Sequence, residues 1–262
     1  MKLSFSNIAW DAEKDLFMYA KLKGLGYSAL EIAPTRILQI DPYENPEAAR
    51  QWASGLKESY GLGISSMQSI WYGRKELLFG SEEERGSLLT YTKKAIDFAA
   101  VIGCNNLVLG CPENRVLLEN SRLSDGVNFF RAVGDYAAEK GTVIGMEANP
   151  PIYNTNYINT TKGAIELIQA VASPGFKLNL DVGTMICNGE EVALLEESME
   201  MIHHVHISEP GLKPLQRRKL HRELGYLLKT SGYKGFVSVE MGFQKDFSFV
   251  EEAAVYVKEM FS

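Results

Sequence analysis

Four residues that could bind a metal ion stand at the ends of four consecutive apolar runs in the second half of the chain. They are Glu147, Asp181, His206 and Glu240. Carboxylate oxygens and an imidazole nitrogen suit Mn²⁺, Mg²⁺ or Co²⁺, and Zn²⁺ also accepts such ligands. Three buried like charges would repel one another, and a bound cation would remove that cost. We therefore predict one divalent metal at these four residues, with Mn²⁺ as the first expectation.

The alternation of side chains along a strand predicts that the four residues share one face of a sheet. The positions two residues earlier, on the same face, carry small or polar side chains: Gly145, Asn179, His204 and Ser238. The residues between them are apolar and should face outward: Met146, Leu180, Val205 and Val239. This pattern predicts a polar interior and an apolar exterior for these four strands.

Short apolar or β-branched runs alternate with longer amphipathic stretches along the whole chain. We expect strands at Lys2–Ser6, Ser28–Ile32, Gly63–Ile70, Asn106–Gly110, Val143–Glu147, Lys177–Asp181, His203–Ile207 and Phe236–Met241. We expect helices at Asp11–Lys23, Pro46–Tyr60, Glu82–Ile102, Arg122–Lys140, Thr161–Val171, Glu190–Met201, Leu215–Ser231 and Phe247–Phe261. Eight strand–helix units predict an α/β fold of parallel strands, a single (β/α)8 TIM barrel.

The alternative arrangement, a doubly wound open sheet, is less well supported because no GxGxxG motif follows the first strand. No Pro/Ser-rich linker or change in composition divides the chain, so we expect residues 1–262 to form one domain. Thr161 is a candidate helix cap, and Gly24, Gly61, Gly103, Gly141 and Gly232 stand where helices should end.

Composition excludes several classes of protein. The formal net charge is −6 and no long block of Lys and Arg occurs, so we expect no nucleic-acid partner. No apolar run is long enough to span a membrane. Three cysteines do not form a secreted disulfide framework, and the first residues lack the apolar core of a signal peptide. A cytoplasmic location is therefore expected.

With these residues in place, the sequence resembles the sugar phosphate isomerase/epimerase family of xylose isomerase-like TIM barrels. That family includes ketose 3-epimerases and, more distantly, endonuclease IV. The resemblance covers essentially the whole chain, and its strongest motifs are Glu147-Ala148-Asn149-Pro150, Leu180-Asp181-Val182-Gly183, Val205-His206-Ile207-Ser208-Glu209-Pro210 and Val237-Ser238-Val239-Glu240-Met241. It implies that the Glu, Asp, His and Glu bind the metal, and that Glu147 and Glu240 also move the substrate proton. Family resemblance also leaves a homo-oligomer open.

The expected activity is a metal-dependent isomerase or epimerase acting on a sugar, sugar phosphate or polyol-derived ketone. Carboxylates would transfer the proton through a metal-stabilised enediolate. Two alternatives remain: a metal-dependent dehydratase acting on a cyclic hydroxyketone, and a non-catalytic sugar-binding barrel. The dehydratase is suggested because the loop Ser208–Leu212 lacks the Arg that the epimerases carry. Only 4 histidines occur in the chain, which does not suit a multi-metal repair endonuclease.

Six further residues are candidates for substrate contact: Glu31, Gln68, Asn114, Arg115, Asn149 and Glu209. The amides of Gln68 and Asn149 suit sugar hydroxyls. Arg115 offers a planar fork of donors for a phosphate or carboxylate, with a surface ion pair as the alternative. Glu31 ends the second strand and could bind a hydroxyl or form an ion pair. In the family, many members have a His at the position of Thr184.

Overall fold

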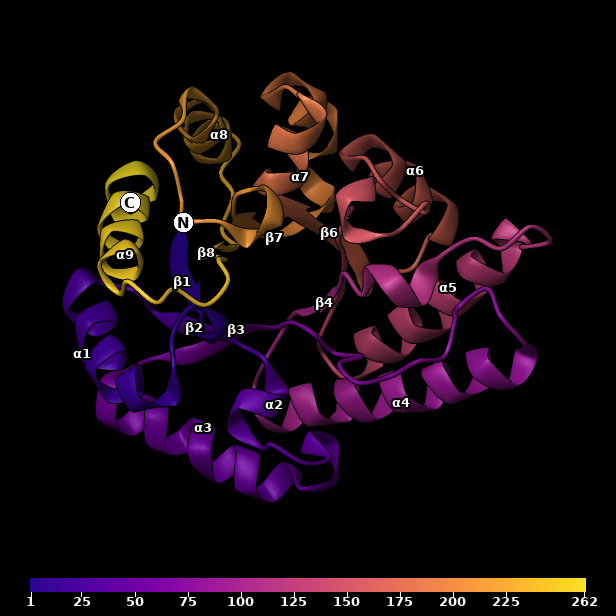
Figure 1. The fold of residues 1–262 in the computed structure, drawn as a ribbon, viewed down its shortest axis with the longest axis horizontal. Helices are drawn as coiled ribbons and strands as arrows, with labels where there is room; N and C mark the ends of the chain where they lie inside the picture. The colour runs from indigo at the N-terminus through magenta and orange to yellow at the C-terminus, as the bar shows by residue number, and fades with distance from the viewer.

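Eight parallel strands form a closed barrel in the computed structural model, which describes residues 1–262 (Figure 1). Each strand pairs with the next in the chain, and the last strand pairs with the first. The strands are β1 (Lys2–Ser6), β2 (Ala29–Ile32), β3 (Gly63–Met67), β4 (Leu107–Leu109), β5 (Ile144–Met146), β6 (Phe176–Asp181), β7 (Ile202–Ile207) and β8 (Phe236–Val239). The predicted (β/α)8 TIM barrel is therefore confirmed.

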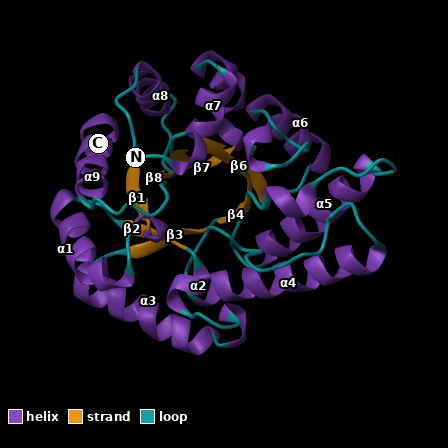
Figure 2. Ribbon diagram, viewed as in Figure 1, coloured by secondary structure: helices purple, strands orange, loops and turns teal.

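Helices surround the ring of strands on its outer side (Figure 2). They are α1 (Asp15–Leu25), α2 (Pro34–Ile37), α3 (Pro46–Tyr60), α4 (Glu82–Val101), α5 (Leu123–Glu139), α6 (Thr161–Val171), α7 (Val182–Asn188), α8 (Lys219–Thr230) and α9 (Ser248–Phe261). Most of the predicted helices lie within a few residues of these bounds, because an apolar stripe and a terminal glycine marked them in the sequence.

The sequence prediction was wrong at several element boundaries. The stretch predicted as a helix at Glu190–Met201 contains a 3-10 helix at Val192–Met201. The short helix α7 was not predicted at all. The N-cap of α6 is Thr160, whose hydroxyl accepts a hydrogen bond from Gly163 N, rather than Thr161.

The helix α1 also ends later than predicted. It continues past Gly24 to Leu25, and Gly26 adopts the left-handed conformation that terminates it, with φ of 85°. Glycine is suited to this position because it has no Cβ to clash in that region.

The barrel is apolar outside and polar inside, as side-chain alternation predicted. Met146, Leu180, Val205 and Val239 are buried against the helices and belong to one cluster of 62 buried apolar residues. The interior instead holds buried polar side chains, among them Ser4, Ser6, Glu31, Ser66, Asn106, Asn179, His204, His206 and Ser238. TIM barrels are ordinarily filled by branched aliphatic side chains, so the polar interior of this barrel departs from the usual filling.

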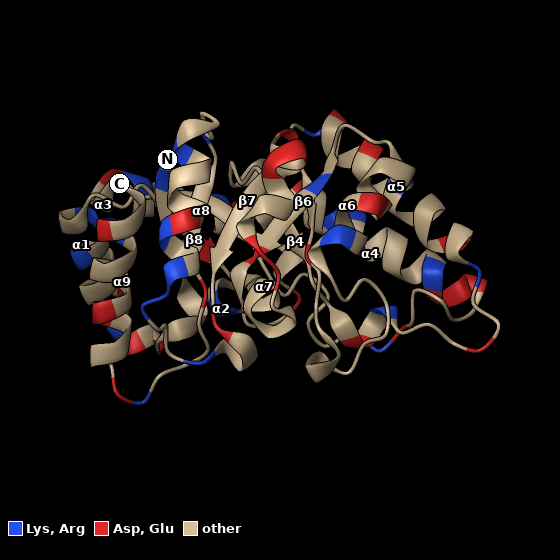
Figure 3. Cartoon of the chain, turned by 90° about the horizontal axis from the view of Figure 1, so that it is seen from above, with Lys and Arg blue, Asp and Glu red and all other residues tan.

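Lys and Arg, coloured blue, and Asp and Glu, coloured red, both occur along the outer helices (Figure 3). One ion pair, between Lys21 of α1 and Glu251 of α9, joins the first and last helices of the ring. No helix of the structure combines the length and the apolar character needed to cross a membrane.

Candidate metal centre

The structure brings Glu147, Asp181, His206 and Glu240 together at the carboxyl end of the barrel. One donor atom from each lies within 4.8 Å of the others. Asp181 and His206 are paired residues of β6 and β7, while Glu147 and Glu240 directly follow β5 and β8. In TIM-barrel enzymes the active site is found at this end.

His206 is fully buried and lies at the centre of the cluster. Its Nδ1 is 3.0 Å from Glu147 Oε1 and 3.1 Å from Glu240 Oε2. On its opposite side, Nε2 is 2.7 Å from Glu31 Oε2. Burial by itself would lower the pKa of His206, but the carboxylates of Glu240 and Glu31 outweigh burial and raise this pKa well above 6.5. These carboxylates therefore favour the doubly protonated, positively charged form of the imidazole when only these side chains surround it.

Asp181 is held by hydroxyl groups and by the first turn of α7. Thr184 N donates to Asp181 Oδ2 over 2.7 Å, so Asp181 is the N-cap of that helix. The Thr184 hydroxyl lies 2.8 Å from the same oxygen, and the Ser208 hydroxyl donates to Oδ1. Burial and the nearby charge of Glu147 raise the pKa of Asp181 to about 6. Thr184 thus orients Asp181 through hydrogen bonds.

Two amide side chains orient the carboxylate of Glu147. Asn149 Nδ2 donates to Glu147 Oε2 over 2.9 Å, and Asn179 Nδ2 donates to Oε1 over 3.1 Å. Gly110, directly after β4, leaves room for this carboxylate. A Cβ atom at Gly110 would lie 2.7 Å from Glu147 Oε2, which is closer than such contacts allow.

Gly110→Ala is therefore expected to impair metal binding much more than folding. Gly110 does not have a positive φ, so alanine fits the backbone, but its methyl group must displace the Glu147 carboxylate. We expect the free energy of unfolding to change by less than about 1 kcal/mol, while Mn²⁺ affinity falls about tenfold or more. Calorimetric titration and urea unfolding measure the two quantities.

Gly63→Ala is the matched control for this substitution. Gly63 also lies at a strand of the barrel, but the nearest atom to its Cβ position is Ser28 O at 3.9 Å, an ordinary contact. Its Mn²⁺ affinity should equal that of the wild-type protein. Wild-type Mn²⁺ affinity in Gly110→Ala would show that the Glu147 carboxylate needs no fixed position.

A cavity of about 520 Å³ opens directly above the cluster. Glu147, Asp181 and Glu240 line its floor and are each 7–8 % exposed, whereas His206 is covered by them. The walls include the side chains of Gln68, Trp71, Tyr72, Asn114, Asn149, Ile152 and Tyr153. The cavity therefore combines carboxylates at its base with walls that are mostly neutral polar and aromatic, and Arg74, Lys75 and Glu113 also line it.

Three of the six predicted substrate contacts line this cavity: Gln68, Asn114 and Asn149. Asn114 uses its amide to donate to the carbonyl oxygens of Arg74 and Glu76, over 3.1 and 3.0 Å, and so supports the loop after β3. The other three predicted contacts lie outside the cavity lining: Glu31, Arg115 and Glu209.

Arg115 differs most from its expected role as an anion anchor. It is fully buried behind the cavity, and its guanidinium donates to backbone oxygens of Gly110, Glu147 and Tyr157 and to Asn149 Oδ1. Burial lowers its pKa to about 10. These donors are already engaged, so they do not bind an anion in the cavity. Arg115 instead connects the ends of β4 and β5 to the loop that follows β5.

Glu209 and Glu31 also differ from expectation, since internal partners engage both. Glu209 pairs with Arg218, whose Nε is 2.7 Å from Glu209 Oε1, and it accepts from Gln216 N. Glu31 is fully buried beneath His206 rather than facing the cavity. Arg218 does not line the cavity either, so it does not supply there the Arg that the epimerase loop carries.

Several residues that shape the site were missed in the sequence. The N-cap spacing of Asp181 and Thr184 was a readable signal for the start of a helix, as was Gly189 for its end, where φ is 65°. Ser208 and Gly110 gave no such signal, because their roles depend on contacts between different strands.

The donor set fits a divalent cation. Three carboxylates and the Nδ1 atom of His206 converge in a buried space, and burial raises the pKa values of both Asp181 and Glu240. Those upward shifts show that the grouped negative charges lack full compensation from the protein. A 2+ ion would supply that compensation, and oxygen-rich sites with one imidazole suit such ions.

Metal binding at pH 7 is expected to release about one proton per ion, because the cation and a proton compete for His206 Nδ1. The pKa of His206 is raised in the metal-free site, so affinity should increase as pH rises toward this pKa. Below about pH 6, Asp181 should take up a further proton and weaken binding again. Calorimetry in buffers of different ionisation enthalpy measures the proton count, and a value near zero would contradict the expectation.

The barrel and this cluster define a class of protein, and a comparison of the chain with family models agrees. The chain belongs to the xylose isomerase-like TIM barrel family, whose model matches residues 19–260. A search of curated proteins finds no match.

Solved structures with the same fold include two sugar epimerases. The 3-keto-D-glucoside 4-epimerase from E. coli has a TM-score of 0.78 at 18 % identity, over 99 % of both chains. The D-psicose 3-epimerase from Clostridium cellulolyticum H10 has a TM-score of 0.77 at 16 % identity, over 100 % of both chains. An AP endonuclease, family 2, from Brucella melitensis has a TM-score of 0.72 at 15 % identity, over 100 % of this chain and 97 % of that one.

Proposed function

We propose that this protein is a metal-dependent sugar isomerase or epimerase. The observation that carries the proposal is the convergence of Glu147 and Glu240 on the floor of one cavity, together with Asp181 and His206. The structures of similar fold that are named as sugar epimerases support this choice of reaction class.

Glu147, Asp181, His206 and Glu240 are the proposed metal ligands, with Mn²⁺ as the first candidate. A bound divalent cation would stabilise negative charge that develops on substrate oxygens when a proton leaves the neighbouring carbon. The chain itself supplies the groups that handle the proton. In the proposal, one of the two glutamates removes it from the carbon beside the carbonyl, and the other returns it.

The face on which the proton returns determines the product. Return to the same carbon on the opposite face inverts that carbon, whereas delivery to the neighbouring carbon interconverts an aldose and a ketose. Asn149 and Asn179 hold Glu147 in one orientation, as proton transfer requires. Gln68, on the wall, offers a neutral side chain for substrate hydroxyls.

The metal content of the wild-type protein and of His206→Ala tests the proposal. Each protein is incubated with Mn²⁺, desalted and analysed by elemental mass spectrometry. We expect about one ion per wild-type chain, because the second group that could hold an ion, Glu31, His204 and His206, shares His206 with the four-residue cluster, and far less in the variant. Equal metal in both proteins would mean that His206 is not a ligand.

His203→Ala provides the matched control. His203 lies on the same strand, but its ring faces Asn105 O, 3.1 Å away, and takes no part in the cluster. Its metal content should equal that of the wild type. The Mn²⁺-loaded enzyme is then screened against ketoses and cyclic hydroxyketones. Epimerisation leaves the substrate mass unchanged, whereas dehydration removes one water and would establish a lyase instead.

A further inference from the structure

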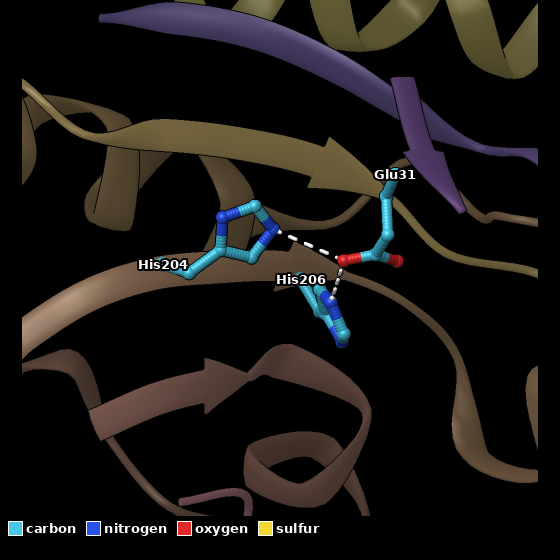
Figure 4. A group of neighbouring side chains, drawn as sticks. All are labelled: Glu31, His204 and His206. Carbon is cyan, nitrogen blue, oxygen red and sulfur yellow. Dashed lines mark hydrogen bonds and ion pairs between the residues drawn. The ribbon is translucent and has the colours of Figure 1, made fainter. Parts of the chain in front are cut away.

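Glu31 lies inside the barrel, and one oxygen of its carboxylate faces two histidines, His204 and His206 (Figure 4). It belongs to β2, whereas His204 and His206 belong to β7, and these strands are not neighbours in the barrel. Glu31 Oε2 is 2.7 Å from His206 Nε2 and 3.2 Å from His204 Nε2. The carboxylate therefore spans the interior to reach the side of His206 that faces away from the cavity.

The two ring nitrogens of His206 have different surroundings. Nδ1 faces Glu147 and Glu240, whereas Nε2 faces Glu31 alone among these carboxylates. A neutral imidazole carries one proton, and only its unprotonated nitrogen can bind a metal. When a metal ion displaces the Nδ1 proton, the acceptor beside Nε2 holds the remaining proton, and the Nδ1 lone pair is left for the metal. Carboxylates commonly support metal-binding histidines in this way.

The rest of the barrel gives Glu31 no comparable partner. The side chain is fully buried, and its second oxygen, Oε1, has no hydrogen-bond partner. Its close contacts are with the Nε2 atoms of the two histidines, and no lysine or arginine forms a salt bridge with it. A buried carboxylate is costly to folding unless its partners compensate it. The contact with His206 therefore explains the burial of Glu31 better than packing of the barrel does.

We infer, building on the proposed metal site, that Glu31 is a positioning residue for His206. It accepts the Nε2 hydrogen bond and holds the ring with Nδ1 directed at the metal position. Glu31 reaches Nε2, the ring nitrogen that faces away from Glu147 and Glu240, and does not line the cavity, so in this proposal it acts on the metal position through His206. His204 contacts the same oxygen from the layer below and limits its movement.

Mn²⁺ titration of the full chain tests this inference with Glu31→Leu and Glu31→Gln. Leucine removes the acceptor and should raise the Mn²⁺ dissociation constant about 10–100-fold. Glutamine keeps a neutral acceptor and should retain part of the affinity. Ser4→Ala is the control, since Ser4 is buried in the same interior and its hydroxyl has no hydrogen-bond partner. Its affinity should stay within twofold of the wild type, a margin of about 0.4 kcal/mol.

A spectroscopic measurement separates positioning from a general effect on structure. In the Zn²⁺-loaded, ¹⁵N-labelled protein, the proton on His206 Nε2 should resonate far downfield, because it is donated to a carboxylate. It should move upfield in Glu31→Gln and in Glu31→Leu, and stay in place in Ser4→Ala. If Glu31→Leu does not fold, as circular dichroism would show, Glu31→Gln alone decides by its affinity and its proton shift.

Two results would overturn the inference in distinguishable ways. Wild-type Mn²⁺ affinity in the Glu31 variants, with an unchanged Nε2 proton signal, would remove Glu31 from the site and leave the proposed metal function intact. Absence of Mn²⁺ and Zn²⁺ binding by the wild-type protein would remove the metal function and the role of Glu31 together.

Discussion

Glu240→Gln is expected to lower turnover by about 10²–10⁴-fold while the barrel remains folded. The substitution preserves the size of the side chain but removes the carboxylate that would accept or return the substrate proton. It also removes one negative metal donor, so metal content must be measured beside turnover. The measurement is kcat at saturating Mn²⁺, with the sugar identified by the substrate screen.

Glu113→Gln is the matched control for this prediction. Glu113 lines the same cavity but belongs to its exposed rim, outside the four-residue cluster. The substitution should change kcat by less than about threefold, because surface substitutions usually change the free energy of the protein by only about 0.5 kcal/mol. Full turnover by metal-loaded Glu240→Gln would show that Glu240 does not move the proton, and another base would have to be sought.

Arg115→Met should lower the free energy of unfolding by at least about 3 kcal/mol. Methionine fills part of the space of the arginine but offers no donor to the backbone oxygens of Gly110, Glu147 and Tyr157. Buried acceptors that lose their partners are costly, and these three lie behind the cavity. Urea unfolding of the metal-free protein measures the effect without any contribution from bound ions.

Arg50→Met provides the comparison on the surface. Arg50 pairs with Glu47 on α3, and both side chains are more than half exposed. Exposed ion pairs contribute less than about 1 kcal/mol, so the unfolding free energy should change little. If Arg115→Met were as stable as Arg50→Met, the Arg115 side chain would be free for a ligand, as its sequence context first suggested.

Much of the fold could be predicted from the sequence because strand and helix periodicities differ clearly. The same alternation indicated which side chains share the barrel interior, and it grouped Glu147, Asp181, His206 and Glu240 on one face. That inference needed only the order of the strands, since neighbouring parallel strands present their carboxyl ends at one edge.

Individual roles were harder to predict where they depend on contacts between distant segments. The residue type of Arg115 is equally compatible with a ligand anchor and with a buried donor to backbone oxygens. Its contacts with β4, β5 and the following loop decide the matter. Glu31 was ambiguous for a similar reason, because its partners on β7 lie more than 170 positions away in the chain.

The N-cap residue of α7, Asp181, is also a proposed metal ligand, so the start of this helix depends on the state of the metal site. The carboxylate that would bind the metal also caps this helix, through Thr184 N. Any event that changes the charge of Asp181 therefore acts on the first turn of α7 at the same time. By reciprocity, order in that turn and occupancy of the proposed site influence each other by the same free energy. The rate of amide hydrogen exchange in the first turn of α7 should therefore change with the concentration of the ion that the proposed site binds.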